Sequence, residues 1–207
     1  ECGKLYSLAP RGKVTVKSAC GAVELSLNVS AGRERIKLAA FDGVFAPHKS
    51  TYRVATESAE FSAEFIEPVE SAGCSVRVTA LNRTAAPLDV GIFAAADKCA
   101  ECDLPQCEFL QACKRNADER CAVALCSESG CSERAADNRG AEISEQFELG
   151  GYEKRAVVIN ALFAESASFL ERRATAMCGD GGFACDEAAA REYCADTDGY
   201  VGAREYA

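Results

Sequence analysis

The cysteines are the feature that most constrains the fold of this chain. It contains 13 of them in 207 residues, and seven lie between residues 98 and 131. Proteins kept reduced in the cytosol rarely carry so many cysteines. We therefore expect a secreted or extracellular protein held together by disulfides, formed among Cys2, Cys20, Cys74, Cys99, Cys102, Cys107, Cys113, Cys121, Cys126, Cys131, Cys178, Cys185 and Cys194.

The odd number of cysteines leaves at least one sulfur without a partner in its own chain. That sulfur is either a buried free thiol or one half of a bond to another chain. The second alternative predicts other extracellular chains as partners, including copies of this one. The spacing does not reveal how the other twelve pair.

Residues 1–97 show the alternation of apolar and polar residues that is typical of β-strands. Turn residues separate the alternating runs, which cover residues 13–17, 23–29, 36–40, 52–54, 61–65, 76–80 and 88–92. Several short strands with one apolar face each predict an antiparallel β-sandwich. We take residues 1–97 as this first domain.

The start of the chain resembles the opening half of CUB-type extracellular β-sandwich domains. The resemblance lies in Glu1-Cys2-Gly3, in Cys20 before an alternating strand, and in Ala31-Gly32 followed by Ile36, Leu38 and Phe41-Asp42. It implies a sandwich that binds proteins or glycans, often with calcium, and it implies a Cys2–Cys20 disulfide.

Residues 98–135 form a second, cysteine-rich segment with the spacing C-x2-C-x4-C-x5-C-x7-C-x4-C-x4-C. A segment this short needs cross-links to stay ordered. Cys113, Ala117 and Cys121 have helical spacing, so the segment is expected to be a partly helical disulfide module inserted into the β fold. Zinc is the alternative, but Cys99-x-x-Cys102 lacks the second tight pair that a four-cysteine site needs.

Residues 136–207 form the third predicted segment. Strands over 143–149 and 155–163 are expected to form a hairpin around Gly150-Gly151, and their pattern faintly echoes residues 21–41. The echo indicates either a second β-unit or one larger sandwich that these strands complete. A short helix over 188–193, capped by Asp186, then leads to an acidic C-terminal loop stapled by disulfides.

The stretch from Cys194 to Glu205 resembles a calcium loop of the EF-hand type. Asp196, Asp198, the Tyr200 carbonyl and Glu205 fall at ligand positions 3, 5, 7 and 12 of that pattern, which has glycine at position 6. Position 1 is a cysteine, whose sulfur is a poor ligand for calcium. The stretch is therefore either a weak calcium site or a plain acidic loop, and no other cofactor is expected.

Two N-glycosylation sequons begin at Asn28 and Asn82. Both asparagines fall on or beside predicted strands, at places where the alternation points outward. Both are therefore candidate glycan attachment sites.

Several classes of function are unexpected. A net charge of −9 without a basic cluster disfavours nucleic acid and anionic membranes, and no apolar run is long enough to insert into a bilayer. The single histidine, His48, stands outside any hydrolase motif, and Glu64, Glu67 and Glu70 resemble solvated strand-end charges more than a catalytic pair. We therefore do not expect an enzyme, and a secreted hydrolase is the least favoured reading.

The sequence thus predicts a mainly β, secreted structural or adhesive module that assembles in an extracellular complex or filament. An extracellular protein- or glycan-binding domain is the alternative.

Overall fold

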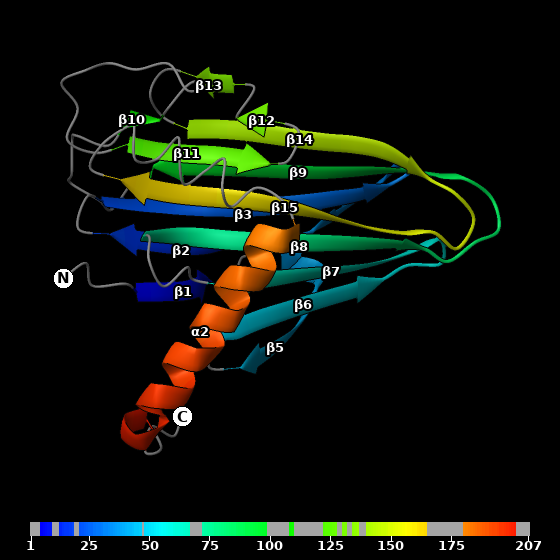
Figure 1. Ribbon diagram of the computed structural model, residues 1–207. Helices are drawn as coiled ribbons and strands as arrows, with labels where there is room; N and C mark the ends of the chain where they lie inside the picture. The colour runs from blue at the N-terminus through cyan, green and yellow to red at the C-terminus, as the bar shows by residue number, and fades with distance from the viewer. Residues whose placement is uncertain are drawn as a thin grey trace.

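The computed structural model describes eleven stretches of the chain: residues 5–9, 13–18, 21–46, 48–66, 72–98, 108–109, 122–127, 130–131, 134–136, 140–164 and 180–201. These stretches are mainly β, with two sheets and a C-terminal helix (Figure 1). Apart from one two-residue parallel pairing, between β10 and β11, neighbouring strands are antiparallel. The predicted fold class is confirmed at this level.

The first sheet, called sheet A, has seven strands within the described residues. In sheet order they are β1 (Leu5–Ala9), β2 (Lys13–Ser18), β3 (Gly21–Ala31), β9 (Leu88–Lys98), β14 (Gly140–Leu149) and β13 (Arg134–Ala136), with β4 (Glu34–Lys37) paired to β3. β2 and β4 pair with successive halves of β3, so β3 and β9 lie in the interior of the sheet.

The second sheet, called sheet B, has eight strands within the same residues. In order they are β10 (Glu108–Phe109), β11 (Ala122–Ser127), β15 (Lys154–Ala164), β8 (Ala72–Asn82), β7 (Ala59–Ile66), β6 (Lys49–Ala55) and β5 (Asp42–Ala46), with β12 (Gly130–Cys131) paired to β11. Strands from the first and third predicted segments therefore lie in the same two sheets.

One hydrophobic core takes residues from both sheets. Leu27 and Ile92 of sheet A belong to it, as do Phe61 and Val78 of sheet B. Leu27, Phe61 and Val78 each lie between two polar residues of their strand, so burial of a single face accounts for the period-two pattern. Ser127 of β11 donates a hydrogen bond to the buried Glu145 carboxylate of β14, which adds a polar link between the sheets.

The strands on either side of Gly150-Gly151 do not form the predicted hairpin. β14 pairs with β9 in sheet A, whereas β15 pairs with β8 in sheet B. Residues 150–153 therefore cross from one sheet to the other, as does the segment between β8 and β9. A local pattern predicted each strand correctly but could not show that the turn changes sheets.

The two crossing segments lie side by side at one end of the molecule (Figure 1). The Tyr152 amide donates to the Thr84 carbonyl at 3.0 Å, and the Asn82 amide donates to the Glu153 carbonyl at 2.9 Å. A Cβ built on Gly151 would lie 2.4 Å from the Ala85 carbonyl oxygen, so only glycine allows this close approach. We call these two segments the paired arches.

Two further elements differ from the sequence-based expectation. Residues 36–40 were predicted as a strand, but the strand ends at Lys37 and a 3-10 turn, η1 (Leu38–Ala40), follows. The C-terminal helix α2 (Asp180–Val201) starts six residues before the predicted cap, Asp186, and is far longer than predicted. The alanines of the segment, including 188–190, favour this longer helix.

α2 lies against the outer face of sheet B, in front of β15, β8 and β7 (Figure 1). Its Phe183 is fully buried and packs with Ile66 and Val158. No helix in the described part of the chain has both the length and the apolar composition that crossing a bilayer requires.

Candidate functional site

The outer face of sheet A carries an open groove of about 820 Å³. Its lining residues are Asn28, Arg35, Lys37, Phe93, Ala94, Ala95, Glu142, Ile143 and Ser144. A smaller hollow of about 460 Å³ continues along the same strands past Ser30, Gly91 and Gln146. Together they form the candidate site, which we call the sheet A groove.

Strand register explains why these side chains come together. Lys37, Asn28, Phe93 and Ser144 are consecutive cross-strand partners on β4, β3, β9 and β14. The next row on the same face contains Arg35, Ser30, Gly91 and Gln146. Residues opposite one another on paired strands share one face, so residues distant in sequence form one continuous surface.

The groove has a shallow floor between two rims of longer side chains. On the floor, Ser30, Ala95 and Ser144 are small and half-buried, and Gly91 has no side chain. Exposed Arg35 and Lys37 form the rim on β4. Exposed Glu142, Gln146 and Glu148 form the rim on β14.

Phe93 is the aromatic residue of the floor. A Cβ built on Gly91 would lie 2.7 Å from Cε2 and 2.8 Å from Cζ of the Phe93 ring, so the ring folds back along β9 over the glycine. The Arg35 guanidinium carbon lies 5.0 Å from the ring centroid, within the range of a cation–π contact. Phe93 and Arg35 therefore form one platform, and its position depends on the missing side chain at residue 91.

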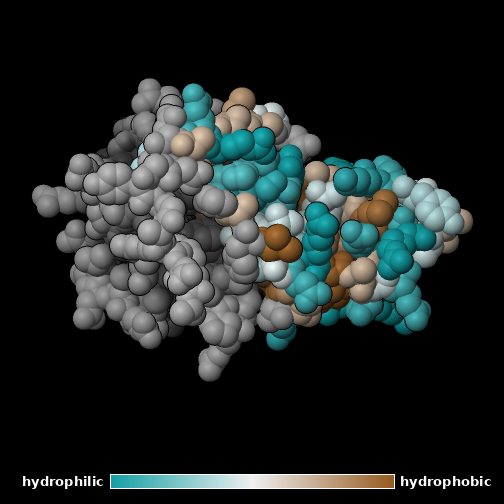
Figure 2. All heavy atoms as spheres, turned by 90° about the horizontal axis from the view of Figure 1, so that it is seen from below, coloured by the Kyte–Doolittle hydropathy of each residue, from teal (hydrophilic) through white to brown (hydrophobic). Residues whose placement is uncertain are grey.

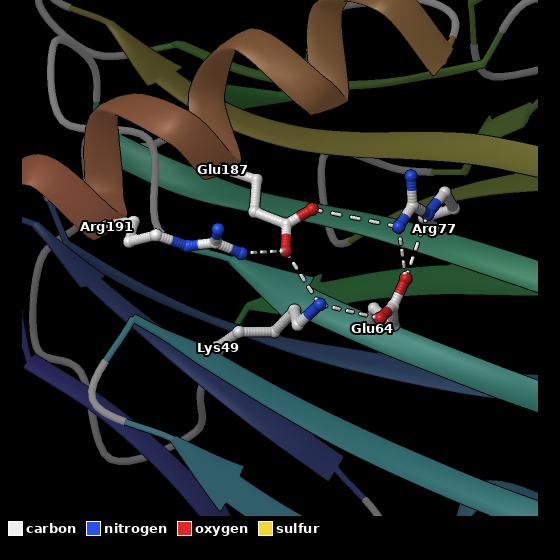
Figure 3. A network of polar contacts seen from close by, with 5 residues as sticks. All are labelled: Lys49, Glu64, Arg77, Glu187 and Arg191. Atoms are coloured by element: carbon white, nitrogen blue, oxygen red, sulfur yellow. Dashed lines mark hydrogen bonds and ion pairs between the residues drawn. The ribbon is translucent and has the colours of Figure 1, made fainter.

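A second polar cluster lies on the opposite side of the molecule, between sheet B and α2 (Figure 3). Lys49 of β6 donates to Glu64 of β7 at 2.8 Å and to Glu187 of α2 at 2.7 Å. Arg77 of β8 donates to Glu64 through Nε at 2.9 Å and through Nη2 at 2.5 Å. Arg191 Nη2 lies 3.6 Å from Glu187 Oε1. We call these five residues the helix-docking cluster: Lys49, Glu64, Arg77, Glu187 and Arg191.

The charges in the helix-docking cluster stabilise one another. Burial raises the pKa of Glu64, but hydrogen bonds from Lys49 and Arg77 outweigh it, so the pKa lies below its ordinary value. Burial lowers the pKa of Lys49, but bonds to Glu187 and Glu64 outweigh it and hold the pKa above its usual range. Glu64 and Lys49 therefore both remain charged near neutral pH, and the bond from Lys49 to Glu187 attaches α2 to the sheet.

The helix-docking cluster gives Glu64 a structural role. It was predicted as a solvated strand-end residue, whereas it is a half-buried acceptor for two cations. Glu67 and Glu70 lie outside the described residues. His48, half-buried in the turn before β6, is not part of either polar site.

The two sequon asparagines have different environments. Asn28 is half-exposed in the sheet A groove, in agreement with its predicted outward position. Asn82 is buried, so its predicted outward position is wrong. Its Nδ2 donates to the carbonyls of Ala86, Leu149 and Gly150 at 2.7, 3.3 and 2.9 Å, and its Oδ1 accepts from the Thr84 amide.

A glycan on Asn82 would be attached to Nδ2, the atom that makes these three bonds. The side chain joins the paired arches in the folded protein, which leaves no room for a sugar at that atom. Burial and hydrogen bonding therefore explain why a sequon at a strand end need not be an attachment site.

The predicted calcium residues lie in and beyond the end of α2. The backbone is helical through Val201, whereas the calcium interpretation requires a loop from Cys194 onward. The side chains of Asp196, Asp198 and Tyr200, and all of Glu205, lie outside the described part of the chain. Among the described side chains, no group of three or more histidine, cysteine, aspartate or glutamate residues could hold a metal ion. Calcium binding stays a prediction.

Four of the predicted disulfide cysteines have described side chains. Cys74 and Cys126 are buried, Cys194 is half-buried and Cys185 is exposed on α2. Cys131 is described in its backbone alone, directly opposite Cys126. The remaining eight, and most of the cysteine-rich segment 98–135, lie outside the described residues, so the disulfide framework stays a prediction.

Comparison with known proteins reveals a likeness in fold alone. No protein-family model matches the chain, and no curated protein sequence is similar to it. Among solved structures, a protein assigned as a kojibiose phosphorylase from the human microbiome is similar, with a TM-score of 0.51 and 6% identity. The match covers 94% of this chain and 31% of that chain.

Proposed function

We propose that this chain is an extracellular binding domain and that the sheet A groove is its ligand-binding surface. One observation carries the proposal: an open groove in which polar side chains of β3, β4 and β14 surround the Phe93 ring of β9. Binding sites commonly combine an apolar contact surface with a few polar groups that fix orientation. Outside the cell, such a domain would bind a protein or a glycan.

The position of the groove supports this assignment. α2 and the helix-docking cluster occupy the outer face of sheet B, whereas the outward-facing side chains of the floor and rims on sheet A are half-buried or exposed. On the side of the molecule seen in Figure 2, hydrophobic atoms of the described surface form small groups separated by hydrophilic ones. That side therefore offers no large apolar surface among the described residues, whereas the sheet A groove offers polar side chains that can hold a ligand.

The likeness to the kojibiose phosphorylase concerns the fold of one part of that protein. The chain spans less than a third of the length of that protein, whose name refers to an activity on the sugar kojibiose. We propose that this chain binds its ligand without converting it.

The extracellular setting rests on the sequence. Thirteen cysteines support a secreted, disulfide-bonded protein. Glycosylation of the half-exposed Asn28 stays a prediction, and because a glycan there would occupy the sheet A groove, the proposed ligand binds the chain that lacks it. We further propose that the two sheets form the predicted antiparallel sandwich, that residues 98–135 form its disulfide-rich insertion, and that the likeness to CUB-type domains holds for the first segment. A weak calcium site near the C-terminus remains part of this proposal.

A second candidate function is covalent assembly into a surface complex or filament. The exposed position of Cys185 on α2 favours it, because a solvent-facing cysteine can reach another chain. The two functions are compatible, since Cys185 and the sheet A groove lie on different elements.

Filling the groove tests the proposed binding surface. Ala95 is half-buried on the floor, and Ala95→Trp would fill the groove without removing a charged or polar contact. Glycans and extracellular protein domains that bind the natural chain should bind this variant at least about tenfold more weakly, a change of about 1.4 kcal/mol. Thermal melting of the variant checks that the fold persists. Unchanged affinity for every ligand found would place the binding surface elsewhere.

A further inference from the structure

We propose that the ligand of the sheet A groove is an uncharged oligosaccharide, one sugar ring of which packs on the Phe93–Arg35 platform. This inference rests on the proposed function and names the chemical class of its ligand. It is carried by three properties of the groove: the pairing of its floor strands, the chemistry of its rims and the position of Phe93.

The pairing of the floor strands requires a ligand bound by side chains. β3 pairs with β9 on one edge and with β2 and β4 on the other, and β9 pairs with β3 and β14. Their backbone hydrogen-bonding groups are therefore used within the sheet. An extended peptide that binds by adding a strand needs a free sheet edge, which the floor of the groove does not offer.

The rims offer opposite hydrogen-bonding capacities. Arg35 and Lys37 on β4 are donors without acceptor atoms, whereas ionised Glu142 and Glu148 on β14 are acceptors without donors. The floor contributes Asn28, Ser30 and Ser144, which do both. A sugar hydroxyl is both donor and acceptor, so a hydroxyl-rich ligand can satisfy both rims at once.

The charge balance argues against a charged ligand. Two basic side chains stand on the β4 rim, two carboxylates stand on the β14 rim, and the exposed Asp89 of β9 adds a third carboxylate beside Glu148 at the smaller hollow. An anion would be attracted to one rim and repelled by the other, and a cation would meet the reverse arrangement. An uncharged, hydroxyl-rich molecule avoids both penalties.

Phe93 supplies the apolar contact that a sugar ring needs. Pyranose rings present C–H groups on their faces, and an aromatic surface can pack against them while the hydroxyls at the ring edge reach polar side chains. The ring lies over Gly91, where a Cβ would come within 2.8 Å of Cε2 and Cζ. The glycine therefore positions the ring along the floor, comparable to the packing of an aromatic residue over a strand glycine in other sheets.

Binding of defined probes to the full chain tests this inference. The probes are kojibiose, maltohexaose and cellohexaose as uncharged sugars, with heparin as a charged one, measured by titration calorimetry. The protein is produced without N-glycans, because a sugar on Asn28 would lie in the same groove. We expect at least one uncharged probe to bind and heparin to bind at least about tenfold more weakly than that probe.

Three variants locate the contact. Phe93→Ala removes the ring, and Arg35→Ala removes the guanidinium over it. Gly91→Ala keeps both the Phe93 ring and the Arg35 guanidinium but displaces the ring. The new methyl group would lie 2.6 Å from Ser30 Oγ and 2.7 Å from Phe93 Cε2, and these flexible side chains must move away. Each should weaken sugar binding about three- to tenfold, as expected for the loss of an aromatic contact.

Arg155→Ala is the matched control. Arg155 is exposed on β15, with its guanidinium carbon 4.4 Å from the ring centroid of Phe147. Phe147 borders the smaller hollow, but Arg155 lines neither part of the sheet A groove and is not part of the Phe93–Arg35 platform. Its substitution removes the same kind of contact and should leave sugar affinity within about twofold of the natural chain.

The outcomes separate this inference from the proposed function. If no uncharged sugar binds, or if heparin binds more tightly, the ligand class is wrong, while any other ligand weakened by Ala95→Trp preserves the binding surface. If sugars bind but the Phe93, Arg35 and Gly91 variants behave like Arg155→Ala, the platform is not the contact. If sugar affinity is unchanged by Ala95→Trp, the proposed surface itself is wrong.

Discussion

Asn82 shows how much of this fold depends on one polar side chain. It is fully buried and connects the end of β8 to both arches through three donated hydrogen bonds and one accepted from a backbone amide. A buried amide with satisfied partners stabilises the fold, and removing it takes a donor from all three carbonyls, although Thr84 Oγ1 still donates to Ala86 and the Glu153 amide still donates to Gly150. The two arches therefore depend on a residue that the sequence marks only as a sequon.

Replacing Asn82 should destabilise the protein strongly. Asn82→Ala removes the donor to three carbonyls, and we expect a loss of about 2 to 4 kcal/mol in the free energy of unfolding. Urea denaturation measures it. The control is Asn28→Ala, at the half-exposed sequon asparagine, which should change stability by less than about 0.5 kcal/mol. Equal effects of the two substitutions would contradict the role assigned to Asn82.

Glu64 predicts a pH dependence whose sign follows from its low pKa. A carboxylate whose folded pKa lies below its unfolded value of about 4.3 contributes stability above that value, and loses it as pH falls through the folded pKa. Glu64→Gln should therefore cost about 1 to 3 kcal/mol at pH 7 and progressively less below about pH 4. Denaturation curves from pH 7 to pH 3 measure the difference, and a constant difference over that range would contradict the pairing.

Lys49 sets the upper pH limit of the stability that the helix-docking cluster contributes. Because its folded pKa lies above the unfolded value of about 10.4, its contribution is complete below that value and is lost as pH rises through the folded pKa. The attachment of α2 through the cluster should thus be constant from about pH 5 to pH 10.

At the scale of elements, the docking of α2 combines an apolar contact with the charged cluster. Phe183 packs on Ile66 and Val158, and the Arg77 guanidinium carbon lies 4.6 Å from its ring centroid. Glu187 and Ala190 follow Phe183 at four- and three-residue steps, so the buried stripe of the helix is only partly apolar.

Removing the Phe183 ring should release the helix from the sheet. Phe183→Ala should cost up to about 3 to 5 kcal/mol, limited by the free energy that docking contributes. Hydrogen exchange of the α2 amides should become much faster, while exchange in β9 stays slow. Glu192→Ala, at an exposed position of the same helix, is the control and should leave exchange unchanged. Protection of α2 that persists in Phe183→Ala would contradict this docking.

Much of the fold at this scale could be predicted from the sequence. Alternating runs such as 23–29 and 61–65 fall within β3 and β7, because one face of each strand is buried in the core. The alternation carries no record of which strands pair, so β14 and β15 were wrongly joined into a hairpin. The sheet A groove was not predicted, because its rows depend on the register of four strands that lie far apart in sequence.

The helix-docking cluster left a weaker signal. Glu187 and Arg191 have the spacing of a helical ion pair, with the acidic residue first. That pattern supports a helix, but it cannot show that Lys49 and Arg77 lie beneath it. Alanine-rich sequence could have extended the predicted helix toward both ends, had the acidic residues after Cys194 not indicated a loop.

At the scale of the whole molecule, Cys185 tests covalent assembly. If this exposed thiol joins chains, non-reducing electrophoresis of native material should show a multimer that collapses on reduction and is absent in Cys185→Ser. Cys74→Ser is the control and should leave the multimer unchanged, because the buried Cys74 cannot reach another chain without unfolding. A monomer in the natural chain would remove assembly through Cys185 and leave the binding function as the remaining proposal.

The paired arches have a consequence for how the chain is made. Because each arch sends one strand to each sheet, the first 98 residues leave the free edges of β8 and β9 without their later neighbours. During synthesis, the unpaired edges of β8 and β9 would stay exposed until residues 140–164 left the ribosome. Exposed strand edges can pair with strands of other chains, so this interval carries a risk of aggregation. Both sheets are therefore completed in one late step, when residues 140–164 pair with β9 and β8, and α2 docks on sheet B only after that.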